Sequence, residues 1–376
     1  MNWKVPFFDL VLGNEEKQAV LDVLASNWLT TGPMIGEFES AFAAAFGGED
    51  QAVAVSSGTA ALHLSLLALG VGPGDEVIVP SLTFVACANA IRYVGATPVF
   101  ADVNSETDLN VSPSDVAAKI TARTRAVMVV HYAGYACDMD RLVALSKQRG
   151  IALVEDCSHA PLSAWKGRLL GTFGESGCFS FFSNKNMTTG EGGMVLTRNQ
   201  NLADRLRILR SHGITASTYQ RFKGHAYGYD VAELGFNYRL DELRAAIGIA
   251  QLCKLPRINA QRKERVARYQ RVIAERLPEV RVPFSGRTAE SSCHIFPVLL
   301  PGDETMRNNT LRGMAERGIQ CSMHYRPIHT FSSYRGVSAD VPVTDRAAAS
   351  LLTLPLFPSL SDAQMDMVVD GLQACL

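Results

Sequence analysis

One lysine in this sequence stands where an amine can do covalent chemistry. Lys185 follows the short apolar run 178–182, whose length and aromatic content are typical of a buried strand. A turn-rich stretch with three glycines, residues 188–193, comes soon after it. A lysine held this way can lose solvation and proton affinity, which an amine needs in order to attack a carbonyl. For a lysine considered alone, a solvated loop position is the simpler interpretation.

Two further segments next to strand-like runs offer groups that can hold a small ligand. Ser57, Gly58 and Thr59 form a turn before an Ala/Leu-rich helical segment, where free amides and the helix dipole favour a phosphate. Asp156 follows the apolar run 151–154, and its carboxylate can accept a charge-assisted hydrogen bond from a protonated ring nitrogen. Both segments have a structural alternative, because Ser, Thr and Asp also form caps and turns without ligands.

An aromatic side chain completes this set of candidates. Phe84 opens a helical pattern just after a strand-like run, so its ring could stack on a flat heterocycle. Aromatic rings at such positions are more often part of the core. A phosphate cradle, an aromatic face, a carboxylate for a pyridinium nitrogen and a lysine for an aldehyde together describe pyridoxal 5'-phosphate (PLP).

The elements that must position these residues alternate between strands and helices. Such alternation predicts right-handed crossovers and an α/β fold, with a mostly parallel sheet between helices. Ligands bind such a sheet beyond the carboxyl ends of its strands, where the three candidate segments fall. The pattern predicts strands at 52–55, 76–79, 98–101, 126–130, 151–154, 178–182 and 194–197, and helices at 15–26, 35–46, 60–69, 83–94, 113–121 and 139–149.

The character of the chain changes after residue 197. Helical patterns dominate up to residue 276, and the last of them is long enough to bridge two domains. Short strands then mix with helices, which is typical of a separate α+β unit. We predict a large domain of residues 1–255 and a smaller C-terminal α+β domain of residues 256–376. The expected helices here are 201–211, 240–255 continuing into 257–276, 304–317, 346–352 and 361–372, and the strands are 294–300 and 320–325.

Composition limits the partners of this protein. The 376 residues are 47% apolar, and 36 Lys and Arg residues nearly balance 37 Asp and Glu residues. This balance gives no indication of nucleic acid or an anionic membrane as a partner. Eight cysteines without a C-x-x-C pair indicate reduced thiols, and we expect no metal site. No uncharged apolar run reaches membrane-spanning length, so a cytoplasmic protein is expected.

The chain resembles the DegT/DnrJ/StrS family of sugar aminotransferases, which belong to the fold type I PLP-dependent enzymes. The resemblance covers essentially the whole chain and implies a seven-stranded sheet in the large domain. It also implies that Lys185 is the Schiff-base lysine, that Asp156 holds the pyridine nitrogen and that Phe84 stacks on the ring. The matching segments are residues 28–33, 56–62, 155–156, the lysine segment 179–194, and residues 235–239 and 354–358.

The same resemblance implies how the cofactor's phosphate is held. Gly58, Thr59 and Ser180 are expected to bind it within one subunit. Asn237 is expected to reach the phosphate of the neighbouring subunit's cofactor, which implies a homodimer with shared active sites. Taken alone, Asn237 would be only a loop asparagine.

The implied reaction moves an amino group in two stages. Glutamate or glutamine is the expected donor, and a keto sugar carried on a nucleoside diphosphate is the expected acceptor. His324, Tyr325 and His329 match a family segment near the substrate cleft, although structural histidines are an equally good interpretation of the two imidazoles.

Three departures from the family pattern put substrate identity in doubt. His159 stands where Gln or Glu is usual, Ser183-Asn184 replaces a common Pro-Ser pair, and Cys293 replaces a frequent aromatic residue. We expect the His159 imidazole to lie within reach of the cofactor's phenolic oxygen and to titrate near neutrality. A purely structural bond beside Pro161 is the alternative.

Three other functions remain open at this stage. A cyclitol ketone could replace the sugar as acceptor. A related dehydratase branch carries histidine in place of the lysine, so Lys185 argues against that activity. A regulatory protein that keeps the fold without catalysis is disfavoured by the complete cofactor set.

Overall fold

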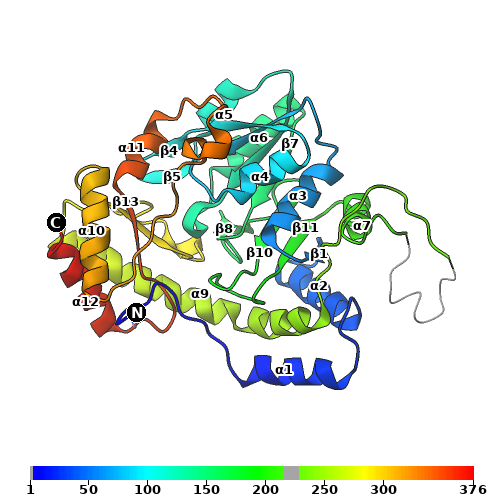
Figure 1. The fold of residues 1–376 in the computed structure, drawn as a ribbon, viewed down its shortest axis with the longest axis horizontal. Helices are drawn as coiled ribbons and strands as arrows, with labels where there is room; N and C mark the ends of the chain where they lie inside the picture. The colour runs from blue at the N-terminus through cyan, green and yellow to red at the C-terminus, as the bar shows by residue number, and fades with distance from the viewer. Residues whose placement is uncertain (1–2, 216–227) are drawn as a thin grey trace.

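A seven-stranded sheet forms the centre of the molecule in the computed structural model, which describes residues 3–215 and 228–376 (Figure 1). Only the β11 strand runs antiparallel to its two neighbours, and the other four pairings are parallel. The predicted α/β fold with a mostly parallel sheet is confirmed. The strands, in spatial order, are β1 (Gln51–Val55), β11 (Gly193–Thr197), β10 (Ser176–Ser180), β7 (Ala152–Asp156), β6 (Thr124–Val130), β2 (Glu76–Pro80) and β3 (Thr97–Ala101).

Helices cover both faces of this sheet because successive strand side chains point to opposite sides. In β1, Val53 and Val55 enter one apolar cluster, whereas Ala52 and Ala54 enter the other. The first cluster includes α3 (Gly58–Ala68), α4 (Ala86–Tyr93) and α7 (Gln200–Leu209). The second includes α2 (Pro33–Ala45), α5 (Pro113–Lys119), α6 (Met139–Arg149) and the first part of α9 (Glu242–Arg276).

Local end signals explain several helix boundaries. Ser112 caps α5, because its side chain accepts a hydrogen bond from the backbone N–H of Asp115. The α6 helix has the predicted bounds, since Gly150 follows it in the left-handed conformation, with φ 64°. The α4 helix begins at Ala86, later than predicted, so Phe84 lies in the turn before it.

The long helix α9 links the large half, which contains the seven-stranded sheet, to the C-terminal half, which follows this helix. It runs without a break for 35 residues through Pro256, and Figure 1 shows it extending from beneath the sheet to the C-terminal helices. Its first part packs on α1 (Asn14–Ala25) and α2, and its later part contacts α12 (Asp362–Gln373). The boundary predicted at residue 255 falls inside this helix and stays a prediction.

The C-terminal part contains the antiparallel pair β12 (Phe296–Leu299) and β13 (Leu351–Leu354), with α10 (Glu304–Glu316), α11 (Pro342–Ser350) and α12 around it. The predicted strand 320–325 is wrong. Ser322 makes only an isolated bridge to Thr353. The side chains of His324 and Tyr325, which follow it, line a cavity instead of continuing a strand. The predicted helix 346–352 also ends early, because Leu351 and Leu352 pair with β12 as strand residues.

Apolar packing and hydrogen bonds join the two halves. One buried cluster joins Tyr132 and Tyr135 of the large half to Phe284 and Leu351 of the other. The Asp102 carboxylate, just after β3, accepts hydrogen bonds from the backbone N–H groups of Val343 and Thr344 in the first turn of α11. Short elements complete the described chain: β4 (Val103–Ser105), β5 (Asp108–Val111), β8 (Ala164–Trp165), β9 (Arg168–Leu169), and the 3₁₀ turns η1 (Tyr132–Gly134), η2 (Thr288–Glu290), η3 (Ile328–Thr330) and η4 (Ser332–Tyr334).

None of the helices in the two described ranges is both long and apolar enough to cross a membrane.

Candidate active site

A cavity of about 350 Å³ lies at the carboxyl ends of the strands and gathers most of the predicted site residues. The large half and the C-terminal half both contribute to its lining. Asn237 and His329 are not among the lining residues in the described parts of the chain. The nine predicted residues that line it are Gly58, Thr59, Phe84, Asp156, His159, Ser180, Lys185, His324 and Tyr325.

The first turn of α3 forms one wall. The Ser57 hydroxyl accepts a hydrogen bond from the N–H of Ala60, whereas the N–H groups of Gly58 and Thr59 have no intrahelical acceptor at this position. A Cβ atom on Gly58 would lie 2.7 Å from the Cβ of Ser180, so only glycine fits where α3 meets β10. Free amides at a helix N-terminus beside the hydroxyls of Thr59 and Ser180 suit a phosphate.

The Asp156 carboxylate is fixed at the end of β7. It is only 5% exposed. Oδ1 accepts a hydrogen bond from the N–H of Ser158 at 2.9 Å, and Oδ2 accepts one from the Cys87 thiol at 3.1 Å. Because a carboxylate has about four acceptor positions, it can still accept a further hydrogen bond from a ligand in the cavity.

Lys185 lies in the loop between β10 and β11, as predicted. Hydrogen bonds to Phe181 close this loop, since the Phe181 carbonyl accepts from the N–H of Thr189 and the hydroxyl of Thr188. Desolvation lowers the pKa of Lys185 to about 8, against the opposing effect of the Asp156 charge. At pH 7 such an amine is neutral in about a tenth of the molecules, far more than an ordinary lysine.

His159 is held at both ring nitrogens. Nδ1 accepts a hydrogen bond from the N–H of Ala133 at 3.3 Å, so the proton of the neutral ring is on Nε2, which donates to the Tyr325 hydroxyl at 2.8 Å. The Tyr325 proton is then left for another acceptor. Burial lowers the pKa of His159 well below its usual range, and the Lys185 charge adds to this effect. The expectation that this imidazole titrates near neutrality is therefore wrong.

The two histidines of the C-terminal segment have different surroundings. His324 lines the cavity, stacks on Phe7 at 5.2 Å between ring centroids, and bonds Thr353 through Nδ1. Burial lowers its pKa to about 4. His329 instead lies between Ser81 and Asp345, at 2.8 and 3.2 Å, as a link between the halves.

Sequence reasoning missed several residues at this site. Ser158, Asn184 and Glu191 also line the cavity. The Asn184 Oδ1 atom is buried and has no hydrogen-bond partner among the described residues, which suits a ligand that donates one. Glu191 lies in the glycine-rich stretch that predicted the loop, and its position there was the available signal. No local signal connects Cys87 with Asp156, because 69 positions separate them.

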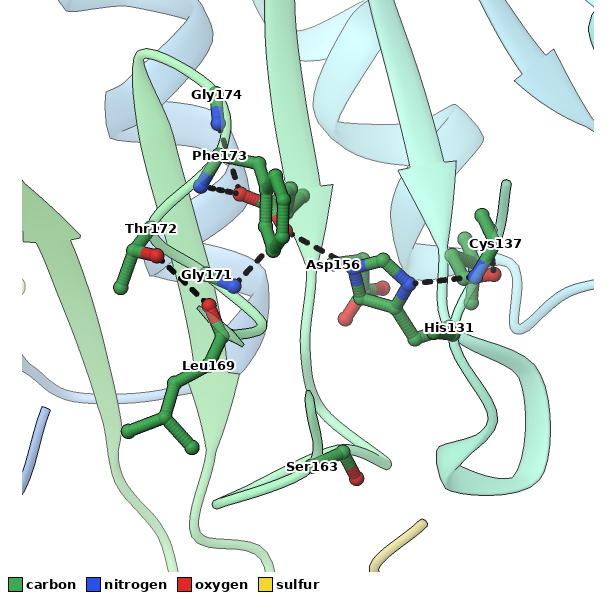
Figure 2. A network of polar contacts seen from close by, with 12 residues as sticks. His131, Cys137, Asp156, Ser163, Leu169, Gly171, Thr172, Phe173 and Gly174 are labelled. Atoms are coloured by element: carbon green, nitrogen blue, oxygen red, sulfur yellow. Dashed lines mark hydrogen bonds and ion pairs between the residues drawn. The ribbon is translucent and has the colours of Figure 1, made fainter. Parts of the chain in front are cut away.

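A second polar group lies beside Asp156 on β7. The buried carboxylate of Glu155 accepts hydrogen bonds from His131, Gly171, Phe173 and Gly174. Figure 2 labels these four donor residues. The other ring nitrogen of His131 accepts the N–H of Cys137. His131, Glu155 and Cys157 have a spacing suited to a metal ion. However, both ring nitrogens of His131 and both carboxylate oxygens of Glu155 already take part in hydrogen bonds. The group therefore anchors the loop after β9 to the end of β7.

The chemical groups that line the cavity match the groups of PLP. The α3 N-terminus suits the phosphate, and the carboxylate of Asp156 suits a protonated ring nitrogen. The Lys185 amine suits the aldehyde. The Phe84 side chain is 56% exposed on the cavity wall, so its ring is available for stacking.

Comparisons with known proteins identify the family. The chain matches the model of the DegT/DnrJ/EryC1/StrS aminotransferase family over residues 11–373. It is 38% identical over 382 aligned residues to the spore coat polysaccharide biosynthesis protein SpsC of Bacillus subtilis (strain 168), with 99% of this chain and 97% of SpsC covered.

Solved structures agree with this result. The aminotransferase TlmJ from Streptoalloteichus hindustanus has a TM-score of 0.91 and 38% identity, covering 99% of this chain and 98% of TlmJ. Spr1654 from Streptococcus pneumoniae, in its PLP form, has a TM-score of 0.90 and 29% identity, covering 100% of this chain and 98% of Spr1654. The predicted resemblance and cofactor are confirmed. The chain belongs to the DegT/DnrJ/EryC1/StrS aminotransferase family and is a PLP-dependent aminotransferase.

Proposed function

We propose that this protein transfers the amino group of glutamate or glutamine to a keto sugar, specifically a nucleotide-linked keto-deoxysugar. The observation that carries the proposal is the meeting of Lys185 and Asp156 in one cavity with His324 and Tyr325 of the C-terminal half. The similarity to SpsC, a polysaccharide biosynthesis protein, supports a sugar as the acceptor.

The chemistry divides between the cofactor and the chain. When bound, PLP supplies an aldehyde that condenses with the Lys185 amine and a ring that takes up electrons from the substrate carbon. Lys185 then serves as general base and acid, a role that suits its lowered pKa of about 8. Asp156 holds the proton of the ring nitrogen, and the amides of Gly58 and Thr59 bind the phosphate with Ser180.

The rest of the cavity suits the hydroxyl-bearing sugar ring of the acceptor. Its polar lining includes Ser158, Asn184 and Tyr325, which offer both donors and acceptors. The low pKa of His324 keeps that ring neutral, so it can exchange hydrogen bonds with a sugar hydroxyl without adding charge. His329 does not line the cavity, so its role would be indirect, through its contact with Ser81 in the turn before Phe84.

We also propose a cytoplasmic homodimer in which Asn237 binds the phosphate of the partner's cofactor. Large apolar side chains stay exposed near Asn237 in the isolated chain: Tyr229 and Val231 are each 56% exposed and Leu234 is 85% exposed. Covering such side chains by a second subunit would remove apolar surface from water. The cytoplasmic location is supported by eight cysteines that are all free thiols.

The test is a half-reaction that needs no second enzyme. Protein in the pyridoxamine phosphate form is mixed separately with nucleotide-linked keto sugars, free keto sugars and cyclitol ketones. Absorbance measures the conversion of the cofactor to PLP in each mixture. We expect the nucleotide-linked sugars to react fastest and Lys185→Ala to be inactive. A response to cyclitol ketones alone would replace the sugar assignment. No conversion of the PLP form by glutamate or glutamine would overturn the donor assignment.

A further inference from the structure

A cysteine behind Asp156 has no part in the chemistry described so far. Cys87 is the second residue of α4 and is completely buried. Its Sγ atom lies 3.1 Å from Oδ2 of Asp156 and 3.4 Å from the hydroxyl oxygen of Thr83. Both partners line the cavity, whereas Cys87 itself lies behind them.

The direction of these hydrogen bonds follows from the chemistry of the groups. An ionised carboxylate only accepts, so the Cys87 thiol must donate to Asp156. A thiol has one proton, so Thr83 must donate its own proton to Sγ. Burial raises the pKa of Cys87 well above its usual range, and the nearby Asp156 charge adds to this effect. The sulfur therefore keeps its proton, and the donor persists at neutral pH.

These contacts fix the carboxylate from two elements. Ser158 holds Oδ1 from the loop that follows β7, and Cys87 holds Oδ2 from α4. A thiol is a weaker donor than a hydroxyl. It restrains the orientation of the carboxylate while withdrawing little of its negative charge, which leaves the carboxylate able to bind a proton on a ring nitrogen.

We propose that Cys87 is a positioning residue, which orients the Asp156 carboxylate toward the cofactor and sets its affinity for the ring-nitrogen proton. The proposal rests on the proposed role of Asp156 at that nitrogen. The hydrogen bond itself does not depend on that role, so the two can be tested separately.

The first test uses the cofactor-free protein and infrared spectroscopy of the S–H stretch. The difference between wild type and Cys87→Ala isolates the band of this thiol. We expect a band shifted to lower frequency by the carboxylate, and we expect it to move back in an Asp156→Ala background. A band at the same frequency in both backgrounds would overturn the proposed bond, whatever the protein's substrate.

The second test uses the PLP-loaded protein and ¹⁵N NMR of the labelled ring nitrogen. Cys87→Ala should weaken PLP binding by roughly tenfold, since a bond to a charged acceptor is lost, and should move the pH at which the ring nitrogen releases its proton. Cys87→Ser restores a donor and should stay within about threefold of wild type for PLP binding.

Cys178→Ala is the matched control. Cys178 is equally buried in the same apolar cluster, but its thiol bonds Ser65 instead of Asp156. Thermal melting establishes that each variant is folded. Equal effects of Cys87→Ala and Cys178→Ala on the ring-nitrogen titration would overturn the proposal, and so would a folded Cys87→Ser that is as impaired as Cys87→Ala.

Discussion

The amine of Lys185 has the surroundings that its chemistry requires. Burial lowers its pKa to about 8, whereas a hydrogen bond from Lys166 to Asp140 raises the pKa of Lys166 above its ordinary value. The pKa values of these two lysines are therefore shifted in opposite directions, so Lys166 serves as an internal control for Lys185.

We predict that Lys185 reacts with an amine-selective acylating reagent at much lower pH than Lys166. The neutral fraction of Lys185 should rise with a midpoint near pH 8 and fall about tenfold for each pH unit below it. Peptide mass mapping of the cofactor-free protein measures both sites together. After PLP loading, borohydride reduction should label Lys185, and a label on another lysine would refute its assignment.

His159 provides a second prediction at the residue scale. Because desolvation lowers its pKa well below the usual range, its ring should remain neutral, and NMR of labelled histidine should show no titration of this residue between about pH 5 and 8. A midpoint inside that window would contradict the buried arrangement. If the bond to Tyr325 extends to the cofactor, His159→Gln should shift the pH dependence of the cofactor spectrum, and an unchanged spectrum would remove that role.

At the scale of elements, the proposed phosphate site depends on how closely α3 approaches β10. Gly58→Ala would place a methyl group 2.7 Å from the Cβ of Ser180, and both positions belong to regular elements with little room to move. We predict that PLP binding weakens by at least about tenfold while the fold is kept, as measured by fluorescence titration and circular dichroism.

Gly36 is the matched control for this substitution. It lies in α2 with nothing within 4 Å of an added Cβ. Gly36→Ala should leave PLP binding unchanged and should stabilise the helix by about 0.5–1 kcal/mol. Equal PLP affinities for the two variants would show that the close approach does not shape the phosphate site.

A polar contact between the halves gives a prediction at the scale of the whole molecule. Asp102→Ala removes the acceptor for the amides of Val343 and Thr344 at the start of α11. We expect a loss of about 1–3 kcal/mol in the free energy of unfolding, because buried donors are left without a partner. Denaturant unfolding measures this loss. Asp370→Ala, which removes only a surface ion pair with Arg276, should cost at most about 1 kcal/mol.

The proposed homodimer gives the last prediction. Lys185→Ala subunits keep Asn237, and Asn237→Ala subunits keep Lys185. A hybrid dimer therefore contains one complete site if each site uses both chains. Mixing the two inactive proteins should restore part of the activity after subunit exchange. Native mass spectrometry of labelled subunits measures the exchange. If the subunits exchange but activity does not recover, a shared site is contradicted.

Local patterns in the sequence are sufficient to predict most of the elements and the main candidate residues. The helical pattern of residues 139–149 predicts α6 with its observed bounds, because periodicity acts over a few residues. The lysine loop, the α3 turn and Asp156 were also found, since each follows a strand-like run and the carboxyl ends of parallel strands meet at one edge.

The contacts between distant segments were decided only by the tertiary structure. Residues 320–325 alternate like a strand, yet His324 and Tyr325 leave the pairing because the cavity buries them. His159 was expected to titrate near neutrality, but burial and the Lys185 charge determine its protonation. The Cys87 bond to Asp156 likewise joins α4 to β7. Desolvation and long-range hydrogen bonding depend on which segments pack together, and no local pattern specifies that packing.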